Sequence, residues 1–153
     1  MRIAVGGNSR KAGKTSVICG LIRALAEYRW TAVKISPHLH PGRSGDTGRY
    51  LSAGAREAVL LGSPPARWPD GNVIIESGAV QDADLYLLVL DLTQPDFKPS
   101  AAAMLTRADA FVVTVGEWDG GERPVFAAPP PRYESAALAE FIRRRLQETS
   151  AEP

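Results

Sequence analysis

The chain has 153 residues and a net charge of +1, and hydrophobic residues make up 44% of it. This length predicts a single domain over residues 1–150 with a proper core, followed by a frayed tail at 151–153. A net charge near zero argues against a nucleic-acid partner or a membrane surface, and no apolar run is long enough to span a bilayer. Cys19 is the only cysteine, which excludes an internal disulfide, and no signal peptide is visible, so a cytoplasmic location is expected.

Apolar runs alternate with segments of helical spacing along the whole chain. The apolar runs predict strands at 3–5, 31–35, 57–61, 72–76, 85–91, 110–115 and 124–128. The helical spacing predicts helices at 14–28, 46–54, 99–107 and 133–147. The predicted strands at 72–76, 85–91 and 110–115 are apolar on both faces, as in a covered parallel sheet. The order predicts a three-layer, doubly wound α/β domain with a mostly parallel sheet and right-handed crossovers.

A glycine-bearing turn lies between the first strand and the first helix. It reads GGNSRKAGKTS from Gly6 to Ser16. Amides in such a loop and in the first helical turn lack helical partners, and they point with the positive end of the helix dipole at whatever lies above them. Lys14 adds a charge for β- and γ-phosphates, and Thr15 offers a hydroxyl to Mg²⁺. The residues predicted to contact a nucleotide are Gly7, Asn8, Ser9, Lys11, Ala12, Gly13, Lys14, Thr15 and Ser16.

The glycine spacing of this turn departs from the usual phosphate-loop pattern. That pattern has a glycine at position 8, where this chain has Asn8, and the glycine comes one residue early at Gly7. Asparagine tolerates a left-handed backbone better than most residues, so the turn can still form. The alternative interpretation is a strand-to-helix turn that binds nothing.

Several polar groups are predicted to meet at one edge of the sheet. Parallel sheets bind ligands outside the carboxyl ends of their strands. The phosphate-loop candidate, the segment after Ile35, Glu76, Asp91 and the loop after Val115 all follow strands and belong to that edge. Lys34 lies inside an apolar strand, where an unpaired charge is costly, so it either reaches an anion or pairs with a carboxylate.

Three stretches resemble a small P-loop NTPase of the molybdopterin-guanine dinucleotide biosynthesis protein B type. The first is the phosphate loop, and the third is VIIESG, which resembles the family's strand ending in Glu-Gly. The second, AVKISPHLHPGRSGDTGRYLSAGAREAVLL, contains Lys34, His38, His40, Asp46 and Ala53-Gly54-Ala55 in the family's order. The resemblance covers roughly the first half of the chain. It implies Mg²⁺-dependent binding and slow hydrolysis of a nucleoside triphosphate, with an adaptor-like role beside a cofactor-biosynthesis protein.

The resemblance also implies roles for two carboxylates. Glu76 lies where the family has an acidic group near the metal, and Asp46 is the candidate for a second metal contact or for orienting a water. The implied catalytic residues are Lys14, Asp46 and Glu76, and the implied metal ligands are Thr15, Asp46 and Glu76. Asp46 can equally serve as the N-cap of a helix, and Glu76 can cap a turn.

Two more distant families share parts of the pattern. The spacing from Gly7 to Thr15 is similar to that of dethiobiotin synthetase, which would imply an ATP-dependent ligase or kinase and a dimer partner to complete the substrate pocket. IIESG with the two following strands is similar to nickel-insertion GTPases, but their guanine-reading Asn-Lys-x-Asp is replaced here by Thr114-Val115-Gly116-Glu117. The base is therefore left open between GTP and ATP. A scaffold that has lost catalysis is a further alternative, and the role of His38 and His40 is also left open.

Overall fold

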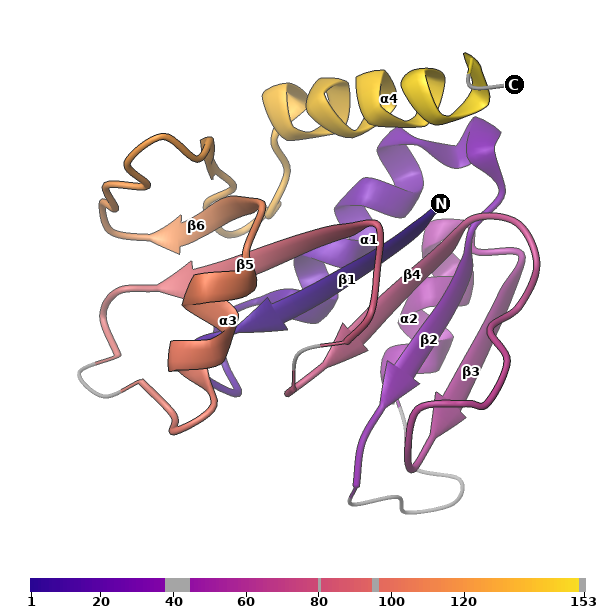
Figure 1. Cartoon of the computed structure of the whole chain (residues 1–153), viewed down its shortest axis with the longest axis horizontal. Helices are drawn as coiled ribbons and strands as arrows, with labels where there is room; N and C mark the ends of the chain where they lie inside the picture. The colour runs from indigo at the N-terminus through magenta and orange to yellow at the C-terminus, as the bar shows by residue number, and fades with distance from the viewer. Residues whose placement is uncertain (38–44, 80, 95–96, 152–153) are drawn as a thin grey trace.

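The computed structural model describes residues 1–37, 45–79, 81–94 and 97–151. Its centre is a seven-stranded sheet in the order β3-β2-β4-β1-β5-β6-β7 (Figure 1). The strands are β1 (Arg2–Gly7), β2 (Thr31–Ile35), β3 (Glu57–Leu61), β4 (Val73–Ser77), β5 (Leu85–Asp91), β6 (Ala110–Val115) and β7 (Val125–Ala127). The two edge strands β3 and β7 are confirmed together with the five inner strands.

All six neighbouring strand pairs in this sheet are parallel. The predicted α/β class with a doubly wound, mostly parallel sheet is therefore confirmed, and the seven strands are all parallel rather than mostly so. Because β1, β2, β4 and β5 run the same way, their carboxyl ends meet at one edge. In the register, Val5 of β1 lies opposite Glu76 of β4, and Lys34 of β2 lies opposite the same glutamate.

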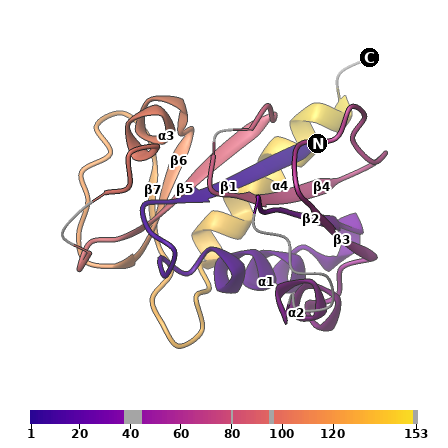
Figure 2. The same ribbon diagram turned by 90° about the horizontal axis from the view of Figure 1, so that it is seen from below.

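Helices cover the two faces of the sheet unequally. The helices are α1 (Lys14–Ala24), α2 (Gly45–Ala53), α3 (Ala101–Arg107) and α4 (Ala136–Ala151). One core cluster joins α1, α2 and α4 to one face, and the other joins α3 to the opposite face. Figure 2 shows α1 and α2 on one side of the sheet and α3 on the other. None of the described helices is long and apolar enough to cross a bilayer.

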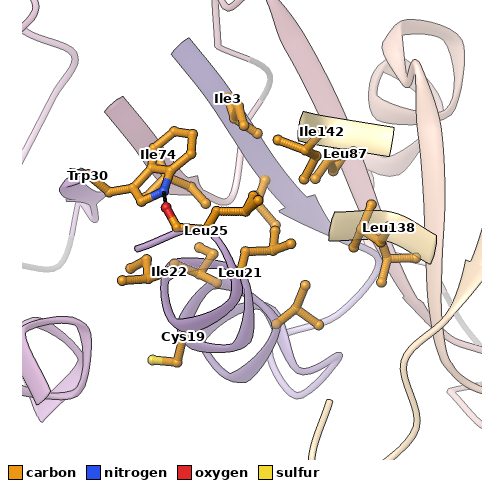
Figure 3. Packing of buried hydrophobic residues seen from close by; sticks show 14 of the residues in the cluster. Ile3, Cys19, Leu21, Ile22, Leu25, Trp30, Ile74, Leu87, Leu138 and Ile142 are labelled. Atoms are coloured by element: carbon orange, nitrogen blue, oxygen red, sulfur yellow. Dashed lines mark hydrogen bonds between the residues drawn. The ribbon is translucent and has the colours of Figure 1, made fainter. Parts of the chain in front are cut away.

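The buried face of α1 forms the centre of the larger core (Figure 3). Leu21, Ile22 and Leu25 are at most 5% exposed, and they pack with Ile74 and Leu87 of the sheet. Burying each such side chain contributes about 1.5–3 kcal/mol. The indole N–H of Trp30 donates to the Leu25 carbonyl over 3.0 Å, so a polar group enters this core with its partner. Cys19 is buried at its margin, as the sequence predicts for a small core residue.

The bounds of α1 and α4 differ from the predicted ones. α1 ends at Ala24 rather than near Tyr28, because a short 3₁₀ turn at Ala26–Tyr28 follows and Arg29 has a φ of 54°. α4 begins at Ala136, since the hydroxyl of Ser135 accepts the Leu138 N–H over 3.1 Å and caps the helix. It continues to Ala151, beyond the predicted end at Gln147.

Candidate functional site

The turn after β1 holds the side chain of Lys14 close to its own backbone. A Cβ added at Gly7 would lie 2.9 Å from Cγ of Lys14 and 3.0 Å from its Cδ. Gly7 therefore makes the space over which the lysine chain folds back across the turn. Gly13 ends the turn with a φ of 103°, a left-handed value that favours glycine, and it is the N-cap of α1. The sequence-predicted loop thus has the strand–turn–helix form that phosphate binding requires.

Asn8 has a structural role that the sequence did not predict. It is fully buried, its Nδ2 donates to the Asp91 carbonyl over 2.9 Å, and its Oδ1 accepts the Asp91 N–H over 3.0 Å. Its own N–H donates to the Val89 carbonyl over 3.1 Å. The expectation of a left-handed Asn8 is wrong, because Arg29 and Tyr133 are the non-glycine residues with positive φ in the described ranges. Asn8 fixes the start of the turn to the end of β5.

In the described part of the chain, the turn and the start of α1 have polar groups without a side-chain partner. The Gly13 N-cap offers no side-chain acceptor to the first amides of α1. The Ser9 hydroxyl is buried, and within the described part of the chain it has no hydrogen-bond partner. Buried polar groups are normally paired, so an orphan hydroxyl beside free helix amides is typical of a site that a ligand completes.

A network of five side chains lies beside the turn. The Thr15 hydroxyl and the Tyr50 hydroxyl each donate to Oε1 of Glu76 over 2.5 Å. Lys34 lies 3.2 Å from the other carboxylate oxygen of Glu76 and also pairs with Asp46. Register explains the first ion pair, because β2 and β4 place Lys34 directly opposite Glu76. Of the two roles left open for Lys34, the structure therefore shows pairing with carboxylates.

The pKa shifts in this network follow from burial and from the carboxylates. Burial lowers the pKa of Lys14, and the nearby charge of Glu76 offsets this only in part. Burial acts in the same direction on Lys34, but its hydrogen bond to Asp46 and the charge of Glu76 outweigh that effect and raise its pKa. Burial, together with the charge of Glu76, raises the pKa of Tyr50, so its hydroxyl stays protonated and donates.

An open cavity of about 260 Å³ joins these groups. Lys14, Thr15, Asp46 and Glu76, which the sequence singles out, line one cavity. The other lining residues are Arg10, Lys11, Gly13, Ser16 and Arg49. The Arg49 guanidinium donates to the Ser16 hydroxyl over 2.9 Å, which fixes α2 against the start of α1. The cavity combines backbone amides, cations and two carboxylates, which suits a polyphosphate with a divalent cation.

The structure also separates residues that the sequence grouped at this edge. Asp91 accepts hydrogen bonds from the N–H and the hydroxyl of Thr93, which hold its pKa below the usual range, and it does not line this cavity. His38 and His40 lie outside the described residues, so their role stays open. Reasoning from sequence missed Tyr50 and Arg10. Helical spacing gave a signal for Tyr50, because it is one turn after Asp46 on α2.

The oxygen atoms near Thr15 fit the needs of Mg²⁺. Hard divalent cations prefer hydroxyl, carboxylate and phosphate oxygens. Thr15 Oγ1 and Glu76 Oε1 are 2.5 Å apart, and Asp46 is joined to Glu76 through Lys34. No group of three or more His, Cys, Asp or Glu side chains in the described ranges could hold a metal by itself. A cation at this point would therefore need phosphate or water oxygens to complete its coordination.

Comparison with known proteins identifies the fold. No family model matches the chain, and no curated protein matches its sequence. Among solved structures, it is similar to LpxK from Aquifex aeolicus, crystallised in complex with ATP, with a TM-score of 0.55 and 19% identity. The match covers 82% of this chain and 53% of LpxK, so the chain spans about half the length of that protein. The all-parallel sheet, the turn before α1 and this likeness together show that the chain has the P-loop NTPase fold.

Proposed function

We propose that the chain binds a nucleoside triphosphate with Mg²⁺ at the loop from Gly7 to Ser16 and acts on its terminal phosphoryl group. One observation carries the proposal. In the described part of the chain, the buried Ser9 hydroxyl has no hydrogen-bond partner, the Gly13 N-cap gives the first amides of α1 no side-chain acceptor, and the half-buried Lys14 lies over the same turn without a paired carboxylate. An anionic group above the turn satisfies all of these groups at once.

The acidic side of the cavity supports a metal-dependent reaction. In this proposal Thr15, Glu76 and Asp46 provide the oxygen atoms for Mg²⁺, directly or through water, and Lys14 holds the β- and γ-phosphates. Tyr50 and Lys34 orient the Glu76 carboxylate by occupying one oxygen each. Bound Mg²⁺ would supply charge neutralisation for the departing phosphoryl group. The chain's own contribution is positioning and electrostatics.

Similarity to an ATP-bound protein favours ATP over GTP as the first nucleotide to test. The best direct test is calorimetry with Mg·ATP, Mg·GTP and Mg·ADP on the wild-type chain and on Lys14→Ala. We expect one nucleotide to bind the wild type, and the variant to lose about 1.5–3 kcal/mol, or roughly tenfold to a hundredfold in affinity. Arg144→Ala on the exposed side of α4 is the matched control for loss of one positive charge. Equal affinities of wild type and Lys14→Ala would refute the proposal.

Two finer roles follow from the family resemblances and predict different kinetics. An adaptor in molybdopterin-type cofactor biosynthesis hydrolyses nucleotide slowly, and added small acids leave that rate unchanged. A ligase or kinase of the dethiobiotin synthetase type forms ADP faster when its acceptor is added. Product formation measured over a panel of small carboxylic acids therefore separates the two. A chain that binds Mg·nucleotide but forms no product at all would be a scaffold.

A further inference from the structure

All four lysines of the chain lie at the carboxyl edge of the sheet. The other 14 of the 18 basic residues are arginines, of which Arg10 and Arg49 line the same cavity. Lys11 and Lys14 line the cavity beside the phosphate loop, and Lys34 lies on β2 opposite Glu76. Lys98, the fourth, comes from the segment between β5 and α3.

The backbone around Lys98 is fixed to two segments of the site. Its N–H donates to the Asn8 carbonyl over 3.4 Å, so it is tied to the start of the phosphate loop. The Ser100 hydroxyl donates to the Gly78 carbonyl over 3.3 Å, which ties the same segment to the end of β4. The Lys98 ammonium lies over Gly78, where an added Cβ would be 3.6 Å from Nζ. The lysine therefore lies between the phosphate loop and Gly78, which follows Glu76 and Ser77 at the end of β4.

The two sides of the phosphate loop differ in charge. On the α2 side, the ammonium of Lys34 is neutralised by Asp46 and Glu76. On the α3 side, no ion pair to Lys98 occurs among the residues that the structure describes. Burial, with the positive charges of Lys14 and Arg10, lowers the pKa of Lys98 to about 8. A half-buried ammonium beside two further cations is unfavourable unless an anion lies among them.

We propose that Lys98 binds an oxyanion beside the phosphate loop, opposite the side that the two carboxylates occupy. The oxyanion is a phosphate or carboxylate group from one of two sources. It is the terminal phosphoryl group of the bound nucleotide, or it is the acidic group of the molecule that receives that phosphoryl. The proposal rests on the proposed function for both sources, but the presence of an anion site at Lys98 can be tested separately with inorganic phosphate.

The small number of lysines makes a direct measurement practical. The protein is labelled with ¹³Cε-lysine, which gives four side-chain signals, and Lys98→Met assigns the signal of Lys98. Its pKa is then measured by NMR in five conditions: free protein, inorganic phosphate alone, Mg·ADP, Mg·AMP-PNP, and Mg·AMP-PNP with inorganic phosphate. Contact with an anion raises the pKa of a lysine by about one unit or more.

Each result assigns or removes one source. A pKa that rises with Mg·AMP-PNP beyond its value with Mg·ADP identifies the terminal phosphoryl group. A pKa that rises only after phosphate is added to the AMP-PNP complex identifies an acceptor site. If calorimetry shows that nucleotide binds and no condition moves the Lys98 signal, the inference is overturned and the proposed function stands. If no nucleotide binds, a rise with phosphate alone keeps the anion site, and no rise removes both.

Affinities provide an independent check on the folded variants. If the terminal phosphoryl group is the anion, Lys98→Met weakens Mg·AMP-PNP binding about tenfold or more and leaves Mg·ADP binding unchanged. Lys98→Arg keeps the charge and restores at least part of the loss. Arg144→Met on α4 makes the same change in net charge away from the site, so it should alter neither affinity. A loss of the same size for Mg·ADP and Mg·AMP-PNP would mean that Lys98 only supports the loop.

Discussion

Asn8 gives the sharpest test of how the phosphate loop is built. Both polar atoms of its side chain are bonded to the backbone of Asp91, and the residue is fully buried. Asn8→Ala removes both bonds and leaves the buried N–H of Asp91 without its partner, whereas the Asp91 carbonyl keeps a hydrogen bond of 3.4 Å from the Gln94 N–H. The unpaired N–H costs about 1–3 kcal/mol, and the lost bond to the carbonyl costs about 1 kcal/mol more. We therefore expect the free energy of unfolding to fall by roughly 2–4 kcal/mol.

Urea denaturation followed by tryptophan fluorescence measures this change, since Trp30 is buried in the larger core. Asn72→Ala is the matched control. Asn72 also uses both side-chain atoms, accepting from the N-terminal amine over 3.0 Å and donating to the Tyr28 carbonyl over 2.9 Å, but it is only partly buried. Water can replace its bonds, so its loss should be about 1 kcal/mol or less.

The usual phosphate-loop pattern has glycine at position 8 and therefore predicts a different result for a glycine substitution. The same urea denaturation assay distinguishes the two explanations. If position 8 needed only backbone freedom, Asn8→Gly would be neutral or stabilising. The structure instead predicts that Asn8→Gly loses at least as much stability as Asn8→Ala. Glycine loses the same hydrogen bonds, and it also gives the unfolded chain more conformational entropy to lose on folding. An Asn8→Gly variant as stable as the wild type would refute this explanation of the residue.

Four further changes test other parts of the structure. Tyr86→Phe removes a buried hydroxyl without a partner in the described part, so urea denaturation should show unchanged or slightly raised stability. Gly7→Ala forces the Lys14 chain to move, so calorimetry should show weaker Mg·nucleotide binding with a change in stability below about 1 kcal/mol. Lys34→Met leaves two carboxylates without their cation and should cost roughly 1–3 kcal/mol in thermal or urea unfolding. The pKa of Lys98 in the folded chain, about 8, is below the ordinary 10.5, so the unfolded chain binds more protons between these values. The stability of the wild type relative to Lys98→Met should therefore rise with pH over that range.

The strands were predictable because each has a local signature. β1, β4, β5 and β6 are nearly fully buried, and their apolar runs are set apart by turns rich in glycine and proline. The helix ends were less predictable because single residues decide them. Ser135 begins α4 through one hydrogen bond, and the φ of Tyr133 keeps the preceding segment out of the helix. Neither feature changes the apolar periodicity from which the helix was predicted.

The missed features of the site depend on contacts between distant parts of the chain. Asn8 bonds to a residue 83 positions away, so local reasoning assigned it backbone freedom instead of a buried pair of hydrogen bonds. Lys98 lies beside the phosphate loop because the segment after β5 is bonded to Asn8 and Gly78. No sequence motif includes it. Tyr50 differs from both, since its place one helical turn after Asp46 on a short helix could have been used.

The register between strands decides which cations remain for a ligand. Sequence alone left Lys34 free to reach a phosphate or to pair, and the β2–β4 register places it directly opposite Glu76. A one-residue slip would move Lys34 to the other face of the sheet and leave Glu76 without its cation. With Lys34 committed to the carboxylates, the cations left for the proposed polyphosphate are Lys14, Arg10 and Lys11 at the cavity and, in our proposal, Lys98 on the other side of the loop. The arrangement of the site is therefore a consequence of strand pairing, which a motif of adjacent residues does not encode.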